Sequence, residues 1–151
     1  MVHPPISRVQ WAPTYRIIPS RYPPIDLFER VAPPEDWEVL AEIEGLTNDR
    51  LRDQVGDISL VPISERLSGP GSTPIMAAFT HPGESRFSDG SFGVYYAARE
   101  SSTAIAESAN SRGRFLSATA EPPMRVEMRT YLGKVNAELH DIRGGWPELH
   151  S

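Results

Sequence analysis

The sequence contains no cysteine, and it lacks the motifs of several common enzyme classes. Without cysteine the chain can form no disulfide bond, no zinc–thiolate site and no thiol nucleophile. The four histidines are scattered, without the close spacing typical of metal sites, so we expect no bound metal. The phosphate-binding, zinc-protease and serine-hydrolase patterns GxxxxGK[ST], GxGxxG, HExxH and GxSxG are also missing.

Long hydrophobic runs and an excess of positive charge are absent as well. No stretch approaches 18 uninterrupted apolar residues, and the first residues lack the basic start and apolar core of a secretory signal. We therefore expect a cytoplasmic protein without a membrane segment. The 15 basic and 20 acidic residues give a formal charge of −5, which disfavours a general nucleic-acid binder but is compatible with a local pocket for a small anion.

Length and composition indicate one globular domain. The 151 residues are 39% hydrophobic and 23% charged, which is ordinary globular usage. Proline is the exception, because the chain has 15 prolines and eight of them precede residue 35. Aromatic and aliphatic residues lie among these prolines, so we expect a buried, extended lead-in over residues 1–34 instead of a linker.

Local patterns along the chain predict an α+β protein without internal repeats. We expect strands at residues 14–18, 58–61, 75–80 and 93–98, and a two-strand ribbon over 125–131 and 134–142 with a turn at Leu132-Gly133. We expect helices over residues 24–31, 34–44 and 47–55, and from a cap at Ser101 or Ser102 to about Arg112. We expect loops or turns over residues 68–74 and 81–90.

The most informative polar residues lie between residues 85 and 107. A loop presents Arg86, a strand carries Tyr96 ten residues later, and a helix carries Glu107 eleven residues after that. Such side chains can converge where the three elements meet, and they suit a substrate with an anionic group and a flat ring. Taken singly, each has an ordinary interpretation. Arg86 can be a solvated loop charge, Tyr96 a half-buried aromatic residue of a strand, and Glu107 a surface residue that favours a helix. The residues alone leave the function open.

The spacing of these segments resembles the core of the RES-domain family. That family has an Arg-aromatic pair in a glycine-rich loop, a strand ending Tyr-x-Ala and a helix reading Ala-x-x-Glu. The matching segments here are Arg86-Phe87, Tyr96-Ala97-Ala98 and Ala104-Ile105-Ala106-Glu107. Upstream, Tyr15-Arg16-Ile17 resembles the opening strand of the family, which carries its own arginine.

The resemblance implies a fold, an activity and partners. Family members are toxins of bacterial toxin–antitoxin pairs, and their fold resembles that of ADP-ribosyltransferases, with a central, strongly bent β-sheet flanked by short helices. They cleave the nicotinamide–ribose bond of NAD and pass ADP-ribose to water, phosphate or a protein. The resemblance therefore implies NAD as substrate, no metal, and a cognate antitoxin with a DNA-binding region. It allows a homo-oligomer within that complex, without direct contact to nucleic acid or membrane.

The same resemblance implies roles for four residues of this chain. Nicotinamide leaves as a neutral group, so Glu107 would stabilise the oxocarbenium-like ribose cation. Arg86 would take part in catalysis by holding pyrophosphate or ribose oxygens through its planar donor fork. Tyr96 would pack against nicotinamide or ribose, and Arg16 is a second candidate phosphate contact.

One departure from the family pattern keeps alternatives open. The family's serine belongs to a C-terminal segment, usually similar to Tyr-x-Ser-x-Arg, which would begin near residues 146–151, and no residue here is assigned to it. We expect one RES-like domain over residues 1–151, with a helical insertion at about 20–75 and that C-terminal segment missing, either because this is a shortened member or because the chain is part of a longer one. The alternatives are a catalytically inactive module that binds a nucleotide or an antitoxin, and a structural α+β protein.

Overall fold

The computed structural model describes residues 3–20, 39 and 56–149, and these form both strands and helices. The predicted α+β class is therefore confirmed. The described residues fall into two compact units, residues 3–20 with 96–149 and residues 56–95. The helices predicted over 24–31, 34–44 and 47–55 lie outside the described residues, apart from Val39, which is helical. The predicted single domain and its boundaries stay a prediction.

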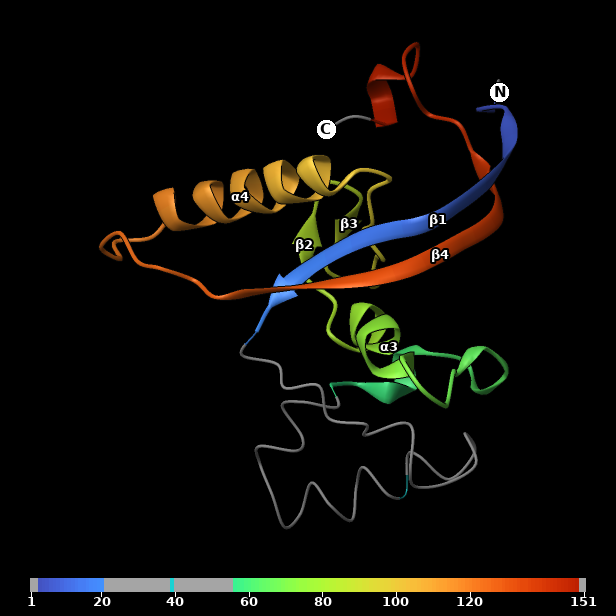
Figure 1. Cartoon of the computed structure of the whole chain (residues 1–151), viewed down its shortest axis with the longest axis horizontal. Helices are drawn as coiled ribbons and strands as arrows, with labels where there is room; N and C mark the ends of the chain where they lie inside the picture. The colour runs from blue at the N-terminus through green and yellow to red at the C-terminus, as the bar shows by residue number, and fades with distance from the viewer. Residues whose placement is uncertain (1–2, 21–38, 40–55, 150–151) are drawn as a thin grey trace. The chain divides into compact units, whose positions relative to one another are not determined.

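A long antiparallel ribbon forms the sheet of the first unit (Figure 1). It pairs β1, Ile6–Pro19, with β4, Met128–His140. The register runs from Ile6 opposite His140 to Pro19 opposite Met128, so almost the whole length of each strand is paired. The predicted strand over residues 14–18 is confirmed as the second part of β1.

A bulge interrupts this ladder where β1 contains a proline. Trp11 lies opposite Val135 and Thr14 lies opposite Gly133, so β1 has one residue more than β4 between these pairs. Proline has no N–H to donate to a ladder, and a bulge is one of the places where a strand accepts it. Pro13 therefore lies where the backbone N–H that proline lacks is least needed for hydrogen bonding between β1 and β4.

The predicted two-strand ribbon with a turn at Leu132-Gly133 is wrong, because residues 128–140 form one continuous strand. Gly133 lies opposite Thr14, so β1 supplies the backbone partners that a second local strand was expected to supply. Leu-Gly is also not among the dipeptides, such as Asn-Gly, that favour a two-residue hairpin turn. The alternation of apolar residues on both sides of Gly133 belongs to a single strand.

Helix α4, Ser101–Ser117, belongs to the same unit and contacts β1. The helix predicted here is confirmed, and it continues beyond Arg112 because the single Gly113 costs a helix only about 1 kcal/mol. The predicted serine cap is wrong, since Glu100 occupies the N-cap position and its side chain makes no capping hydrogen bond. Ala104, only 6% exposed, marks the buried face of α4.

The second unit contains α3, Ser72–Thr80, where the sequence analysis expected a loop and then a strand. The predicted strand at residues 75–80 is wrong. The buried residues of α3 are Ser72, Met76, Ala78 and Thr80, and Ser72, Met76 and Thr80 follow one another at the four-residue spacing of a helix face. Pro74 lies in the first turn, where backbone N–H groups have no partner within the helix. A short apolar run does not by itself distinguish a helix from a strand.

The predicted strand at residues 58–61 is also wrong, because the short 3₁₀ helix η2, Ile58–Leu60, forms there. The Asp57 carboxylate accepts a hydrogen bond from the Ser59 backbone N–H at 3.0 Å, which bends the chain locally. The buried Arg66 donates from Nε to the Val61 carbonyl at 2.9 Å. A second 3₁₀ helix, η3, spans Ile63–Glu65.

A small hairpin follows α3 and confirms that residues 81–90 form turns. It pairs β2, Glu84–Ser85, with β3, Ser88–Asp89. The strand predicted over residues 93–98 is wrong except at Ala98, which forms an isolated bridge with Tyr15.

Gly93 lies directly against the backbone of α3. A Cβ atom added to Gly93 would lie 2.1 Å from the Ala78 carbonyl oxygen and 2.5 Å from the Phe79 Cα atom. The backbone of α3 therefore occupies the space where a side chain larger than that of glycine would lie.

We predict that Gly93→Ala lowers the free energy of unfolding by about 1–3 kcal/mol, because the new methyl group collides with backbone that has little freedom to move. Gly113→Ala is the matched control, since a Cβ there meets nothing within 4 Å and the substitution should stabilise α4 by about 0.5–1 kcal/mol. Urea unfolding followed by circular dichroism measures both. Equal stability of Gly93→Ala and the wild type would contradict the packing of Gly93 on α3.

The register of the ribbon predicts that Arg8→Cys with Glu138→Cys forms a disulfide on mild oxidation. These residues lie directly opposite each other, and opposed Cα atoms in antiparallel strands are about 4.5–5.5 Å apart, within disulfide range. Arg8→Cys with Thr130→Cys is the control, because Thr130 lies opposite Ile17, about 25 Å further along at roughly 3.3 Å per residue. Mass spectrometry without reductant measures both, and cross-linking in the control alone would refute the register.

Candidate functional site

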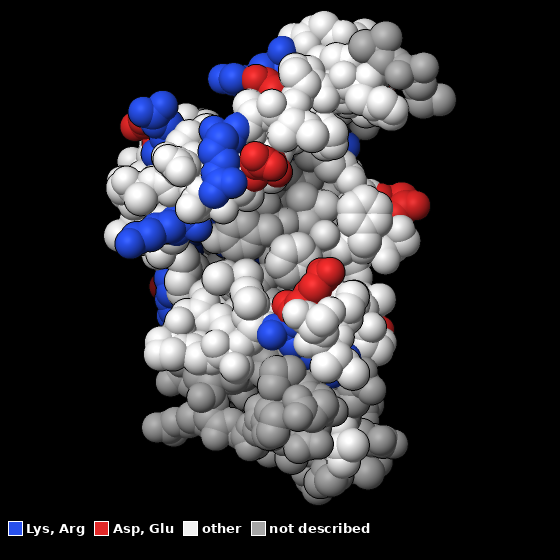
Figure 2. Space-filling view, turned by 90° about the vertical axis from the view of Figure 1, so that its right-hand side faces the viewer, with Lys and Arg blue, Asp and Glu red and all other residues white. Residues whose placement is uncertain are grey.

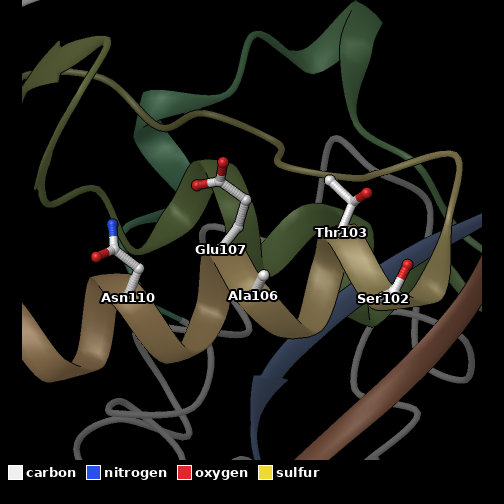
Figure 3. A pocket seen from close by; sticks show the side chains of 5 residues that line it. All are labelled: Ser102, Thr103, Ala106, Glu107 and Asn110. Atoms are coloured by element: carbon white, nitrogen blue, oxygen red, sulfur yellow. The ribbon is translucent and has the colours of Figure 1, made fainter.

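Glu107 lies on the exposed side of α4, in a shallow and open depression of about 420 Å³. The residues that line this depression share one face of the helix, because they are three or four positions apart. The lining residues, all from α4, are Ser102, Thr103, Ala106, Glu107 and Asn110 (Figure 3).

Ala106 lies between the polar residues of this depression (Figure 3). Its side chain ends at a single methyl group, which leaves space between the longer side chains of Thr103, Glu107 and Asn110. Of the residues of this helix, only Glu107 was predicted from the sequence as a site residue. Thr103 is four residues before Glu107 and Asn110 three residues after it, so helical spacing was the signal that would have identified them.

Strand β1 holds the segment that contains Tyr96. The Arg16 guanidinium donates from Nη1 to the Tyr96 carbonyl oxygen at 3.1 Å. Next to it, the Tyr15 N–H donates to the Ala98 oxygen at 2.8 Å, and the Ala98 N–H donates to the Tyr15 oxygen at 2.9 Å. The structure thus brings two predicted site residues together, through the backbone of Tyr96. The Tyr96 side chain is 43% exposed, and the predicted phosphate contact of Arg16 stays a prediction.

Arg86 is one of the two turn residues of the β2–β3 hairpin and is exposed. The buried Ser88 fixes the chain that follows, because its hydroxyl donates to the Phe92 carbonyl at 2.6 Å and accepts from the Gly90 N–H at 3.1 Å. Arg86 belongs to the second unit, whereas Tyr96 and Glu107 belong to the first. Their predicted convergence around one dinucleotide stays a prediction.

Asp89 adds a negative charge to the same hairpin. The Ser91 hydroxyl and backbone N–H both donate to its carboxylate and lower the pKa of Asp89 below its ordinary value. Asp89 is therefore ionised at neutral pH, three residues after Arg86. With Glu84, the hairpin therefore carries two carboxylates and the single guanidinium of Arg86.

The wider surface shows mixed charge and few candidates for metal binding. Among the described residues, no group of three or more His, Asp or Glu side chains could hold a metal ion. On the face drawn in Figure 2, described Lys and Arg side chains lie among Asp and Glu side chains, without a large area of one sign. In the part of the chain that the structure describes, no helix is long and apolar enough to cross a membrane.

Comparison with known proteins identifies the family. Residues 64–150, more than half of the chain, match the RES domain. The chain therefore belongs to the RES-domain family, as the resemblance predicted, and this family is linked to NAD-processing enzymes. The match includes Arg86, Tyr96 and Glu107, whereas Arg16 lies before it.

The chain also matches a curated relative. The uncharacterized protein y4oC of Sinorhizobium fredii (strain NBRC 101917 / NGR234) is 35% identical over 131 residues. The matched region covers 85% of this chain and 56% of that protein, so the chain spans little more than half the length of this relative. No solved structure matches the chain.

We predict that Arg16→Met shifts the backbone amide resonance of Ala97, because the Ala97 N–H and the Tyr96 carbonyl belong to one peptide unit. Loss of the hydrogen bond should also lower the free energy of unfolding by about 1 kcal/mol. Arg8→Met is the control on the same strand, since Arg8 donates to Asn136 instead. Nitrogen–proton correlation spectra and urea unfolding measure both effects. An unchanged Ala97 resonance in Arg16→Met would exclude this contact in solution.

Proposed function

We propose that this protein is an NAD-cleaving toxin of a bacterial toxin–antitoxin pair. The observation that carries the proposal is the RES-domain match across Arg86, Tyr96 and Glu107. It is supported by the position of Glu107, whose exposed carboxylate lies on the open face of α4, where a substrate can reach it.

The proposed reaction breaks the bond between the nicotinamide nitrogen and C1′ of the adjoining ribose. The bonding electron pair leaves with the nitrogen, so nicotinamide departs neutral and the positive charge develops on the ribose ring. The Glu107 carboxylate stabilises this oxocarbenium-like charge in the transition state. With water as acceptor, its oxygen bonds to C1′ and a proton is released, which gives ADP-ribose and nicotinamide. Phosphate or a protein side chain would replace water in the same step.

The other proposed site residues bind the substrate. The Arg86 guanidinium takes pyrophosphate or ribose oxygens through paired N–H donors. The partly exposed Tyr96 ring packs against nicotinamide or ribose and offers its hydroxyl as a further hydrogen bond. Arg16 holds the Tyr96 carbonyl and thereby supports the position of this ring, in addition to its proposed phosphate contact.

The proposed partner is a cognate antitoxin with a DNA-binding region. Within this proposal the toxin acts in the cytoplasm, where NAD is available, and the antitoxin suppresses it by covering the active site. A protein acceptor of ADP-ribose is a further candidate partner. Mass spectrometry of lysate proteins after incubation with NAD identifies that case, because transfer to a protein leaves an ADP-ribose adduct and the other acceptors do not.

We predict that Glu107→Gln lowers the rate of nicotinamide release from NAD by about a hundredfold or more, because the amide keeps the shape of the side chain but not its charge. The substitution should leave folding intact, since Glu107 is exposed. Glu121→Gln, at another exposed position of the first unit, is the control and should retain wild-type turnover. Chromatographic quantification of nicotinamide measures both, and growth arrest on expression should follow the same order.

The outcomes separate the proposal from its alternatives. Unchanged turnover in Glu107→Gln would remove Glu107 from its role. NAD binding by the wild type without nicotinamide release would support an inactive binding module. An unchanged melting temperature with NAD present would indicate a protein without a nucleotide site, because a bound ligand raises stability.

A further inference from the structure

Strand β4 has one edge that no described strand pairs with. The sheet of the first unit has the order β1–β4, so among the described residues β4 is bonded to β1 along one edge only (Figure 1). An unpaired edge presents a row of backbone N–H and C=O groups, which another strand can bind. A ribbon of two strands is also only marginally stable in water, and further strands on a common face stabilise it. The open edge of β4 is therefore a candidate interface.

The hydrogen bonds around the ribbon show which residues of β4 direct their backbone to this edge. Tyr15 uses its N–H and C=O for Ala98, so Tyr15 and the opposed Leu132 form a pair without mutual hydrogen bonds. The backbone groups of Leu132 and of every second residue along β4 then point away from β1. The bulge lies in β1, so it does not interrupt this alternation in β4. In agreement, the Asp141 N–H, an odd number of residues from Leu132, donates to the Pro5 carbonyl at 2.7 Å.

Lys134, Asn136 and Glu138 are three successive members of this alternating set, and all three are exposed. Their side chains lie on one face of the ribbon, because successive residues of a strand face opposite sides. Arg8 lies opposite Glu138 but donates from Nε to the Asn136 side-chain oxygen at 3.1 Å. Neither Lys134 nor Glu138 forms an ion pair with another described residue. Two opposite charges thus lie at equal distances on either side of Asn136, along an open edge.

This arrangement is complementary to a second copy of itself. When two β4 strands pair antiparallel about a two-fold axis at Asn136, each Lys134 lies opposite Glu138 of the second copy. Opposite charges directly across from each other stabilise a sheet, whereas like charges destabilise it. A two-fold axis at Lys134 or at Glu138 would instead oppose like charges. The charges therefore favour one register of self-pairing.

We propose that this protein forms a homodimer through β4, with Asn136 at the two-fold axis and Lys134 opposite Glu138 of the second copy. The same edge serves both copies, so the interface closes after two copies and builds no longer assembly. The two ribbons become one sheet of four strands. Val135 and Ala137 lie on the other face of β4, so the dimer also joins the apolar faces of the two ribbons. The proposal is independent of the proposed reaction with NAD.

A single introduced cysteine tests the position of the two-fold axis, because the chain has no cysteine of its own. In Asn136→Cys the two cysteines oppose each other in a hydrogen-bonded pair with Cα atoms about 5.5 Å apart, so mild oxidation should give a covalent dimer. Gln10→Cys is the matched control, since the exposed Gln10 lies opposite Asn136 on β1. In the dimer the two copies of Gln10 are three strand spacings of about 4.8 Å apart, beyond disulfide range. Mass spectrometry without reductant measures both. A covalent dimer from neither variant, or equally from both, would overturn the interface.

Exchange of the charges tests the register. Lys134→Glu and Glu138→Lys each oppose like charges twice in the dimer, so each should raise the dissociation constant of the dimer about tenfold or more. A mixture of the two variants restores both opposite pairs in a heterodimer, which should dissociate within about threefold of the wild type. Analytical ultracentrifugation measures all four samples, and circular dichroism confirms that the variants are folded. A wild type that stays monomeric throughout the micromolar range, or a mixture that associates no better than its components, would overturn the proposal.

Discussion

The mutual hydrogen bonds between Tyr15 and Ala98 are the constraint on which the candidate site depends. A strand residue directs its N–H and its C=O to the same side, so Tyr15 uses this side for Ala98 while β1 uses its other edge for β4. Helix α4 begins three residues after Ala98, at Ser101. The ribbon therefore holds the start of the helix that carries Glu107, and the Arg16 contact to Tyr96 strengthens the same attachment.

Local chemistry explains which elements the sequence could predict. Helix formers over α4 and turn residues before Gly90 act within a few residues, so both elements were predicted correctly. The apolar runs of α3 and η2 were too short to distinguish a helix from a strand. Pro74 is compatible with the first turn of α3, and the Asp57 carboxylate accepts a hydrogen bond from the Ser59 N–H in η2. The partner of β4 lies more than a hundred residues away in the sequence, and no local periodicity contains that information.

The residues of the candidate site also fall into those that the sequence could predict and those that it could not. Spacing identified Arg86, Tyr96 and Glu107 as one family pattern, because each lies in a segment with its own local signal. The hydrogen bond from Arg16 to the Tyr96 carbonyl involves backbone from a distant segment, and side-chain chemistry alone gives no indication of it. Helical spacing could have identified the polar neighbours of Glu107 on α4. Only the structure shows that they line the same depression as Glu107.

The wide separation of β1 and β4 has a consequence for how the chain folds during its synthesis. Strand β1 emerges from the ribosome first, and its long partner ends at His140, so the ribbon forms only after nearly all of the described chain has been translated. Contacts of such high sequence separation slow folding and leave strand edges open in the meantime. While residues 20–127 are being synthesised, β1 is therefore without its partner β4, and the edge that pairs with β4 is open to other extended segments.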